Sequence, residues 1–285
     1  MLMHRIGSQI VDSTKSIGLL LIIIITILSI SYSFEMEEPQ KPIIGIYYNY
    51  SQDSTIEIIS NLQRMKEIGF QIISIPILWN DNPTSPIRIK NRVFYSTAKQ
   101  LGFEIYVREP WNLAEYTPYL SEYGDKITYI QIMNEADAKL LKEWYVPGEL
   151  ISIACENAEI AKKINPNIKT VASFATPFLI TLVHDIAQYA DIVALDIYED
   201  INLYTFPIQM QILLTASGKQ NLWIGEFGYA TPNDQDQANF IIKGLNLFKK
   251  NGVETVIIWV WHDNVGLKIK DRQAETEIEN WIKNN

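Results

Sequence analysis

The sequence has very few of the residues that build disulfide frameworks and metal sites. Cys155 is the single cysteine among 285 residues, so no intramolecular disulfide can form. The three histidines, His4, His184 and His262, lie far apart and show no metal-ligand spacing. We therefore expect chemistry that is carried by carboxylates, without a bound metal or another cofactor.

Positive charge is also scarce. Lys and Arg number 24 against 33 Asp and Glu, which gives a formal net charge of −9 and a pI near 5.0. Without a basic patch the chain lacks the electrostatic footprint of a nucleic-acid-binding protein. Its 47% hydrophobic and 20% charged residues are typical of a globular protein with a large core. We expect a monomer with no nucleic-acid partner.

One long apolar run lies near the beginning of the sequence. Residues Ile17 to Ile30 read IGLLLIIIITILSI and follow basic residues, which is the pattern of an export signal or a signal anchor. A membrane-spanning helix needs about 17–25 residues, so the run reaches the lower limit when it is extended to Phe34. Residues 1–34 are therefore predicted to be a signal peptide or a membrane anchor, and residues 35–42 a charged linker. The rest of the chain is expected to be extracellular, either secreted or held at the cell surface.

From Ile43 onward the sequence repeats a strand-and-helix unit about every 30 residues, the size of a βαβ unit. Short apolar runs typical of buried parallel strands alternate with helical stretches. The eight runs begin near Ile43, Ile72, Glu104, Thr128, Ile168, Asp191, Asn221 and Glu254. Eight such units over residues 43–285 predict an α/β fold, a single (β/α)8 TIM barrel. A doubly wound open sheet is the alternative, but no glycine-rich phosphate turn follows the first run.

Several helix boundaries are marked by capping residues. Ser54 and Glu57 have the spacing of a capping box, and Gly69 is suited to end the same helix. Asp234 is expected to cap a later helix. Pro177 is expected to open the helix that follows the fifth strand.

Polar and aromatic residues collect where the predicted strands end, which in a TIM barrel is the mouth that carries the active site. The fourth strand ends in Asn134-Glu135 within IQIMNEAD, and the seventh ends in Glu226 within LWIGEFGYA. A charged side chain at the end of a buried strand costs folding free energy unless it has an ion-pair or hydrogen-bond partner, so it is expected to have such a partner or a functional role. Other strand ends supply rings that can stack on sugars and groups that can bind hydroxyls. These residues are Tyr48, Trp79, Arg108, Trp111, Tyr198, Trp259 and Trp261.

The motifs at the fourth and seventh strand ends resemble the catalytic signature of the clan A glycoside hydrolases. The segment from Gly69 to Trp79 is similar to the second-strand motif of family 5 cellulases and mannanases, although Ser74 stands where that family usually has arginine. Arg108, at the end of the third strand, is available for the role of that arginine. MNEAD and GEFG are also similar to motifs of the small glycosidase-core families. The resemblance is therefore to the clan, over most of residues 43–285.

This resemblance implies a TIM-barrel enzyme that hydrolyses β-glycosidic bonds of a polysaccharide or oligosaccharide with retention, acting within the sugar chain. Glu226 would be the nucleophile, and Glu135 would be the acid that becomes the base of the second step. Asn134 would contact the 2-hydroxyl of the sugar. The expected partner is thus a carbohydrate, together with the membrane if the N-terminal segment is not cleaved.

The remaining strand-end residues have expected supporting roles. Donors such as Tyr198 or Arg108 would hold Glu226 in its ionised form. Trp261 or Trp259 would form the floor of the subsite at the scissile bond. Tyr48, Trp79 and Trp111 are expected to bind other parts of the substrate.

Two other functions could use the same barrel. A non-catalytic carbohydrate-binding barrel would keep the cleft without activity, and the presence of both glutamates disfavours it. A metal-dependent barrel enzyme of the enolase type would need carboxylates at three neighbouring strand ends and a lysine base. The third and fifth strand ends carry Arg108 and Ser173 instead, so this alternative fits poorly.

Overall fold

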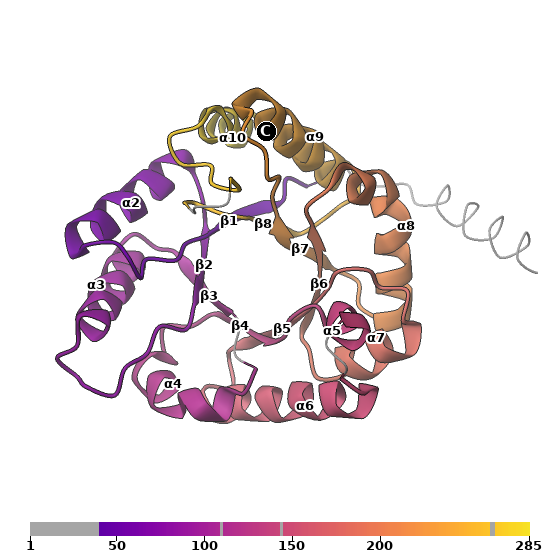
Figure 1. The fold of residues 1–285 in the computed structure, drawn as a ribbon, viewed down its shortest axis with the longest axis horizontal. Helices are drawn as coiled ribbons and strands as arrows, with labels where there is room; N and C mark the ends of the chain where they lie inside the picture. Colours follow the sequence, from indigo (N-terminus) through magenta and orange to yellow (C-terminus); the bar gives the residue numbers. More distant parts are fainter. Residues whose placement is uncertain (1–39, 109–110, 143–144, 263–265) are drawn as a thin grey trace, which may run out of the picture. The chain divides into compact units, whose positions relative to one another are not determined.

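The computed structural model describes residues 40–108, 111–142, 145–262 and 266–285. Within these residues, eight parallel strands form one closed barrel in sequence order, and pairing of the first with the eighth strand closes it. The strands are β1 (Ile43–Tyr47), β2 (Ile72–Pro76), β3 (Glu104–Arg108), β4 (Tyr129–Met133), β5 (Lys169–Phe174), β6 (Ile192–Ile197), β7 (Leu222–Phe227) and β8 (Thr255–Ile258). The predicted single (β/α)8 barrel is confirmed (Figure 1), and each strand begins within one residue of its expected start.

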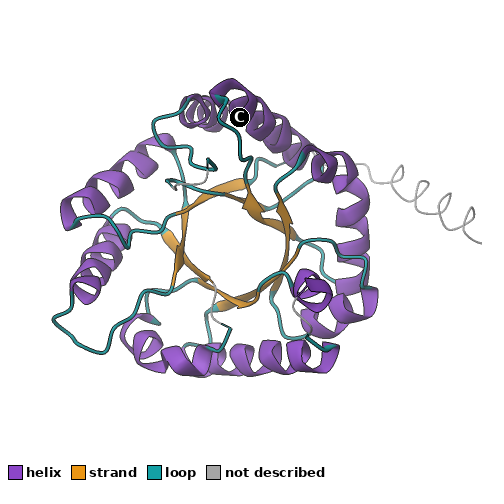
Figure 2. Ribbon diagram, in the orientation of Figure 1, coloured by secondary structure: helices purple, strands orange, loops and turns teal. Residues whose placement is uncertain are grey.

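Helices surround the ring of strands (Figure 2). They are α2 (Thr55–Ile68), α3 (Pro86–Gln100), η1 (Leu113–Tyr116, a 3-10 helix), α4 (Thr117–Tyr123), α5 (Ala136–Lys142), α6 (Pro147–Ile164), α7 (Ile180–Ala187), α8 (Asp200–Ser217), α9 (Asp234–Lys250) and α10 (Gln273–Asn284). Each of the long helices covers the strands with an apolar stripe, as in α2, where Ile58, Leu62 and Met65 are buried at helical spacing.

The predicted ends of α2 are confirmed. The Ser54 hydroxyl accepts a hydrogen bond from the backbone N–H of Glu57, and the Glu57 carboxylate accepts one from the backbone N–H of Ser54. Gly69 ends the helix with φ +107°, a left-handed conformation that glycine adopts without steric cost.

Two other predicted helix starts are wrong by one to three residues. Asn233, and not Asp234, caps α9, because the Asn233 side chain accepts hydrogen bonds from the N–H groups of the first helical turn. Asp234 is the first helical residue, and its carboxylate binds Arg272 instead. Pro177 does not open α7, which begins at Ile180 after an irregular turn.

The apolar side chains form two layers. The larger layer contains residues from both helices and strands, so it lies between the ring of helices and the barrel wall. The smaller layer contains no helical residue and takes one side chain from almost every strand, which places it inside the barrel. Its aromatic members are Tyr47, Tyr106 and Trp223, with Tyr129 and Trp259 packed against them. The barrel is therefore a packed core beneath its mouth.

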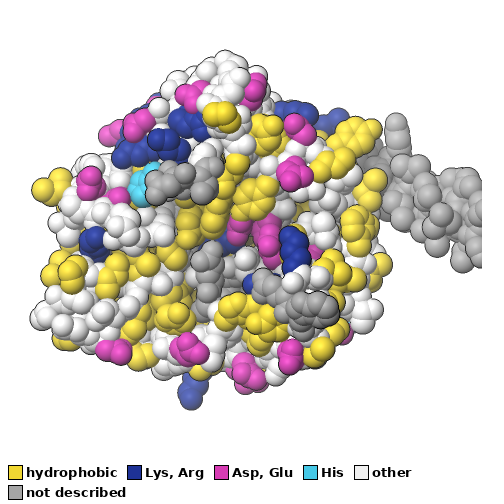
Figure 3. Space-filling view, viewed as in Figure 1, with side chains coloured by type: hydrophobic (Ala, Val, Ile, Leu, Met, Phe, Trp, Pro, Cys, Tyr) yellow, Lys and Arg dark blue, Asp and Glu magenta, His cyan; other side chains and the backbone are white. Residues whose placement is uncertain are grey.

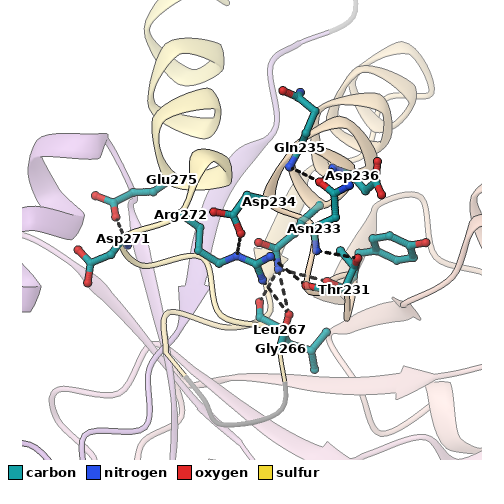
Figure 4. Close-up of polar contacts among 12 residues, drawn as sticks. Thr231, Asn233, Asp234, Gln235, Asp236, Gly266, Leu267, Asp271, Arg272 and Glu275 are labelled. Carbon is teal, nitrogen blue, oxygen red and sulfur yellow. Dashed lines mark hydrogen bonds and ion pairs between the residues drawn. The ribbon is translucent and has the colours of Figure 1, made fainter.

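Two loops at the last strands are held together by Arg272, which precedes α10 (Figure 4). Its guanidinium donates to the carbonyl of Thr231 at 2.9 Å, in the loop after β7, and to that of Gly266 at 3.1 Å, in the loop after β8. It also pairs with Asp234 at 2.6 Å. The buried Gln237 donates to carbonyls of the same two loops. These contacts hold one side of the barrel rim in place.

Gln40–Asn285 form one compact unit. The predicted signal or anchor, residues 1–34, and residues 35–39 of the predicted linker lie outside the described residues. Among the helices that the structure describes, none is both long and apolar enough to cross a bilayer.

Candidate active site

Glu135 and Glu226 lie at the same end of the barrel. Glu135 stands between the end of β4 and the start of α5, and Glu226 lies in β7 just before its last residue. Because all eight strands are parallel, both positions belong to the mouth formed by the carboxyl ends of the strands. Figure 3 shows acidic side chains gathered in the middle of one face of the molecule, with basic side chains beside them.

Glu226 is buried against a cation. Its side chain is only 7% exposed and forms an ion pair with Arg108, which ends β3 and is itself fully buried. The Arg108 guanidinium also donates to the carbonyl of Gly225 at 2.7 Å and to the side-chain oxygen of Asn134 at 3.3 Å. These contacts orient the guanidinium toward Glu226. The pair stabilises the negative charge of Glu226, which a nucleophilic carboxylate requires.

Glu135 has a different environment. It is partly exposed, and burial together with the nearby Asp137 raises the pKa of its carboxyl above the usual value. The positive charges of Lys142, Arg108 and Lys139 oppose this shift without cancelling it. A carboxyl group with a raised pKa retains a proton that it can donate, as a general acid must.

The backbone presents Glu135 in an uncommon conformation. Its φ is +43°, in the left-handed region that residues with a side chain seldom occupy. Its N–H points to the hydroxyl of Ser173 on β5 at 3.3 Å, and its carbonyl accepts from the N–H of Lys139 in α5. The buried Asp137 adds a further link, because it accepts from the N–H of Ala175 in the loop after β5 at 2.9 Å. The start of α5 is thus tied to the neighbouring strand, and this tie holds Glu135 at the mouth.

Asn134 is oriented by three donors. Its Oδ1 accepts from Arg108, from Nε2 of Gln131 at 2.9 Å and from the hydroxyl of Ser173 at 3.0 Å. Its Nδ2 makes no hydrogen bond to any residue that the structure describes. The amide is therefore held with its oxygen toward the barrel and its donor end available to a ligand.

The structure separates the two predicted floor residues of the sugar subsite. Trp259 is partly exposed, stacks on Tyr47 with ring centroids 3.8 Å apart, and lies beneath the guanidinium of Arg108 at 5.0 Å. Trp261 is completely buried in the layer between helices and strands, so it has no surface for a sugar to contact. Of the two, only Trp259 is placed to be the floor. Tyr198, directly after β6, is partly exposed at the same mouth.

Tyr48 is also too deeply buried to bind substrate directly. Its ring is fully buried, and its hydroxyl donates to the carboxylate of Asp53, which in turn contacts Nε2 of His262 at 3.1 Å. Asn61 of α2 donates to the same carboxylate at 2.9 Å. This network joins the loop after β1 to the loop after β8, so Tyr48 supports the rim and does not line it.

Two predicted binding residues lie on the outer rim, in contact with cations. Trp79 is partly exposed, with the guanidinium of Arg88 over its ring at 3.8 Å. Trp111 is 36% exposed, stacks on Tyr145 at 4.8 Å and has the amine of Lys139 over its ring at 4.1 Å. Both rings are thus partly covered by neighbouring side chains.

Four residues beside the two glutamates were not predicted as site residues. Gln131 and Ser173 join the network around Asn134, and Asp196 of β6 pairs in register with Glu226 of β7. Gly225 leaves space for Asp196, since a Cβ at this position would lie 2.6 Å from the Asp196 carboxylate oxygen. For Gln131, Ser173 and Asp196 the sequence signal is a polar residue at an inward position within an otherwise apolar strand.

No cluster of histidine, cysteine and acidic residues in the described part of the chain could hold a metal ion. The site as described is built from two glutamates, one arginine, an amide and aromatic rings.

The chain is similar in structure to several glycosidases at low identity. The endo-1,4-β-D-mannanase of Thermotoga petrophila RKU-1 matches with a TM-score of 0.66 and 13% identity, over 85% of this chain and 99% of that protein. An FMN-binding β-glucuronidase from Facaelibacterium prausnitzii L2-6 matches with a TM-score of 0.64 and 13% identity, over 89% and 45% of the two chains. The exo-β-1,4-mannosidase Op5Man5 from Opitutaceae bacterium strain TAV5 matches with a TM-score of 0.63 and 11% identity, over 86% and 59%.

These comparisons establish the fold. The chain is a TIM barrel, the fold that it shares with these glycosidases. The chain covers about half the length of the glucuronidase and nearly the whole length of the mannanase. No protein-family model matches the sequence, and the search of curated proteins finds no match.

Proposed function

We propose that this chain is a retaining glycoside hydrolase that cleaves β-glycosidic bonds of a polysaccharide or oligosaccharide. The observation that carries the proposal is the contrast between two glutamates at one barrel mouth. Glu226 is paired with the buried Arg108, whereas the pKa of Glu135 is raised by burial and by Asp137. One carboxylate is held ionised and the other is held ready to donate a proton, which is the pair that a double displacement needs.

In the first step Glu226 attacks the anomeric carbon, and Glu135 transfers its proton to the departing oxygen. A covalent glycosyl-enzyme results, and the leaving group departs as an alcohol. In the second step the Glu135 carboxylate takes a proton from water, whose oxygen attacks the anomeric carbon and releases Glu226. The two inversions together retain the configuration of the sugar.

The neighbouring residues fit the same reaction. Asn134 has its amide donor end free toward a ligand, where it can bind a sugar hydroxyl that becomes more acidic in the transition state. Trp259 offers a ring face for the sugar, supported from behind by Tyr47. The similarity of the fold to mannan-cleaving and glucuronide-cleaving enzymes supports a carbohydrate substrate.

The direct test is a screen of the purified protein against β-glucans, mannan, xylan and galactan, with reducing ends as the readout. We expect hydrolysis of at least one, and product sizes will show whether cleavage is internal. The E226Q variant serves as the control and should release no sugar. Binding of a glycan without hydrolysis by the wild-type protein would instead establish a carbohydrate-binding barrel.

We also propose that residues 1–34 direct export, so that the barrel works outside the cell. The support is the apolar run that precedes the barrel in the sequence. Fractionation of cells that express the full chain should recover the barrel outside the cytoplasm. Recovery in the cytoplasm with Met1 intact would contradict the proposal.

A further inference from the structure

Asp196 is a carboxyl group to which the proposed mechanism assigns no role. It lies on β6, is 2% exposed, and stands next to Glu226 in the register of the β6–β7 pair. Neither of its carboxyl oxygens makes a hydrogen bond of normal geometry to a described residue, and the Ser173 hydroxyl, which faces Asp196 and lowers its pKa slightly against the main shift, donates to Asn134 instead. A buried carboxylate without a well-placed donor is strongly disfavoured relative to its neutral form.

The surrounding charges do not offer Asp196 a partner of its own. The groups that face it are Glu226 on β7, Arg108 on β3, Glu135 after β4 and Ser173 on β5. Arg108 is the single fully buried cation of the described residues, and it is oriented toward Glu226, Gly225 and Asn134. The two glutamates repel a negative charge at Asp196. Burial and the charge of Glu226 accordingly raise the pKa of Asp196 well above its usual value, although Arg108 opposes the shift.

The sequence makes room for this acid. The Asp196 carboxyl group lies over Gly225, where any side chain would have to displace it. The residue that precedes the proposed nucleophile is therefore a glycine because a second acid occupies that space.

We infer that Asp196 is a positioning residue that stays protonated in the folded enzyme, filling the space beside Glu226 as a neutral acid and leaving the charge of Arg108 to Glu226. The inference rests on the proposed function for the role of Glu226. Asp196 is buried beside Glu226, so it acts through the orientation and charge of that neighbour. If it lost its proton, two adjacent carboxylates would compete for one guanidinium.

The protonation state has a consequence for stability that can be measured without a substrate. An acid whose pKa is raised by folding binds its proton more tightly in the folded state than in the unfolded state. Its effect on stability is therefore most favourable below about pH 4, the usual range for aspartate, and is lost as the pH rises toward the folded pKa. Asparagine has nearly the shape of the neutral acid but cannot ionise.

The first experiment compares wild type with D196N in urea at a series of pH values. We expect the D196N midpoint to shift upward relative to wild type as the pH rises from about 4 to 8. In the infrared difference spectrum of the two proteins at neutral pH, we expect the C=O band of one protonated carboxylic acid in wild type. A D196N midpoint that instead falls relative to wild type over that range, or the lack of the acid band, would overturn the inference.

Carbon-13 NMR of aspartate-labelled wild type is the second measurement, and it applies even if D196N folds poorly. One aspartate carboxyl should keep the chemical shift of the protonated form at neutral pH. Activity adds a third readout, in which D196A loses kcat at least about tenfold and D196N recovers most of the loss. A protein that is inactive on all glycosides would overturn the proposed function, whereas the spectroscopic results would still decide the state of Asp196.

Discussion

The two sides of the barrel mouth place a glutamate in opposite environments. On the β3–β7 side, Glu226 is enclosed and held against a guanidinium that is itself hydrogen-bonded on two other sides. On the β4–α5 side, Glu135 has a left-handed backbone conformation and is partly open to solvent, and partial burial together with the charge of Asp137 raises its pKa. The comparison shows that roles within a carboxylate pair are assigned by the surrounding elements, since the side chains are chemically identical.

The largest expected effects come from removing each glutamate in turn. E226Q should abolish hydrolysis of every substrate, with a loss of at least about a thousandfold, because no glycosyl-enzyme can form. E135Q should lose about a hundredfold to ten-thousandfold on ordinary substrates but still react with dinitrophenyl glycosides, whose leaving group needs no acid.

Azide then distinguishes the two sides. It should restore turnover of E135Q and yield the β-glycosyl azide, because a small anion attacks the glycosyl-enzyme without a base. Rescue of E226G should yield the α-azide. Product configurations found the other way round, by NMR, would show that the roles are reversed.

A smaller effect is expected from loosening only the β3–β7 side. R108K keeps the charge, but an ammonium cannot make the planar contacts to Glu226, Gly225 and Asn134 at once. We expect kcat to fall about a hundredfold, as for other preorganised donors, with a smaller change in KM. R272K is the matched control, since Arg272 makes comparable contacts to the rim loops but none to either glutamate. Equal losses of kcat in both variants would mean that Arg108 acts only on the fold.

The β4–α5 side can be tested through stability. A left-handed conformation costs a non-glycine residue about 1–2 kcal/mol, and E135G removes this cost. Part of the gain in stability is offset because glycine is more flexible in the unfolded chain. We expect an inactive protein that is more stable in urea by about 1 kcal/mol at pH 7. The gain should shrink below about pH 4, because the raised pKa of Glu135 costs stability only above the usual range for glutamate.

The control for this prediction is the same substitution in a helix. Glu156 is exposed within α6, so E156G should lower stability by about 1 kcal/mol. Destabilisation by both substitutions would remove the argument that Glu135 is strained.

The smallest expected effect concerns the network behind Tyr48. The hydrogen bond to Asp53 raises the pKa of His262, although burial opposes the shift. The pair therefore stabilises the folded protein fully below about pH 6.5, the usual pKa of histidine. This stabilisation is lost as the pH rises through the folded pKa of His262. H262Q should therefore lose up to about 1 kcal/mol near pH 5.5 and nothing near pH 9. H184Q, which removes an imidazole contact to a backbone carbonyl and none to an acid, is the matched control for the loss of a histidine contact. Urea midpoints of both variants across this range provide the measurement.

Much of the barrel was predictable because parallel strands buried on both faces leave continuous apolar runs. That pattern located every strand start to within one residue, and the capping box located the start of α2. Asn233 and Asp234 can both cap a helix, and only the backbone geometry decides between them. Pattern alone therefore finds elements better than it finds their first residue.

The site was less predictable, for a geometric reason. Glu135 and Glu226 were found because they close strands, and a strand end must lie at the mouth. Trp261 and Tyr48 also follow strand ends, yet the chain turns their rings into the layer beneath the helices. Which way a side chain points after the last ladder residue depends on the loop that follows, which leaves no periodic signal.

The closure of β1 onto β8 has a consequence for how the molecule is made. Ile43 pairs with Thr255, so β1 and β8 each lack one neighbouring strand until they pair with each other. During synthesis the growing chain holds two unpaired strand edges, each able to pair with another chain. Until Thr255–Ile258 are available to pair, the first seven strands can form only an open sheet, and the barrel closes in the last step of assembly.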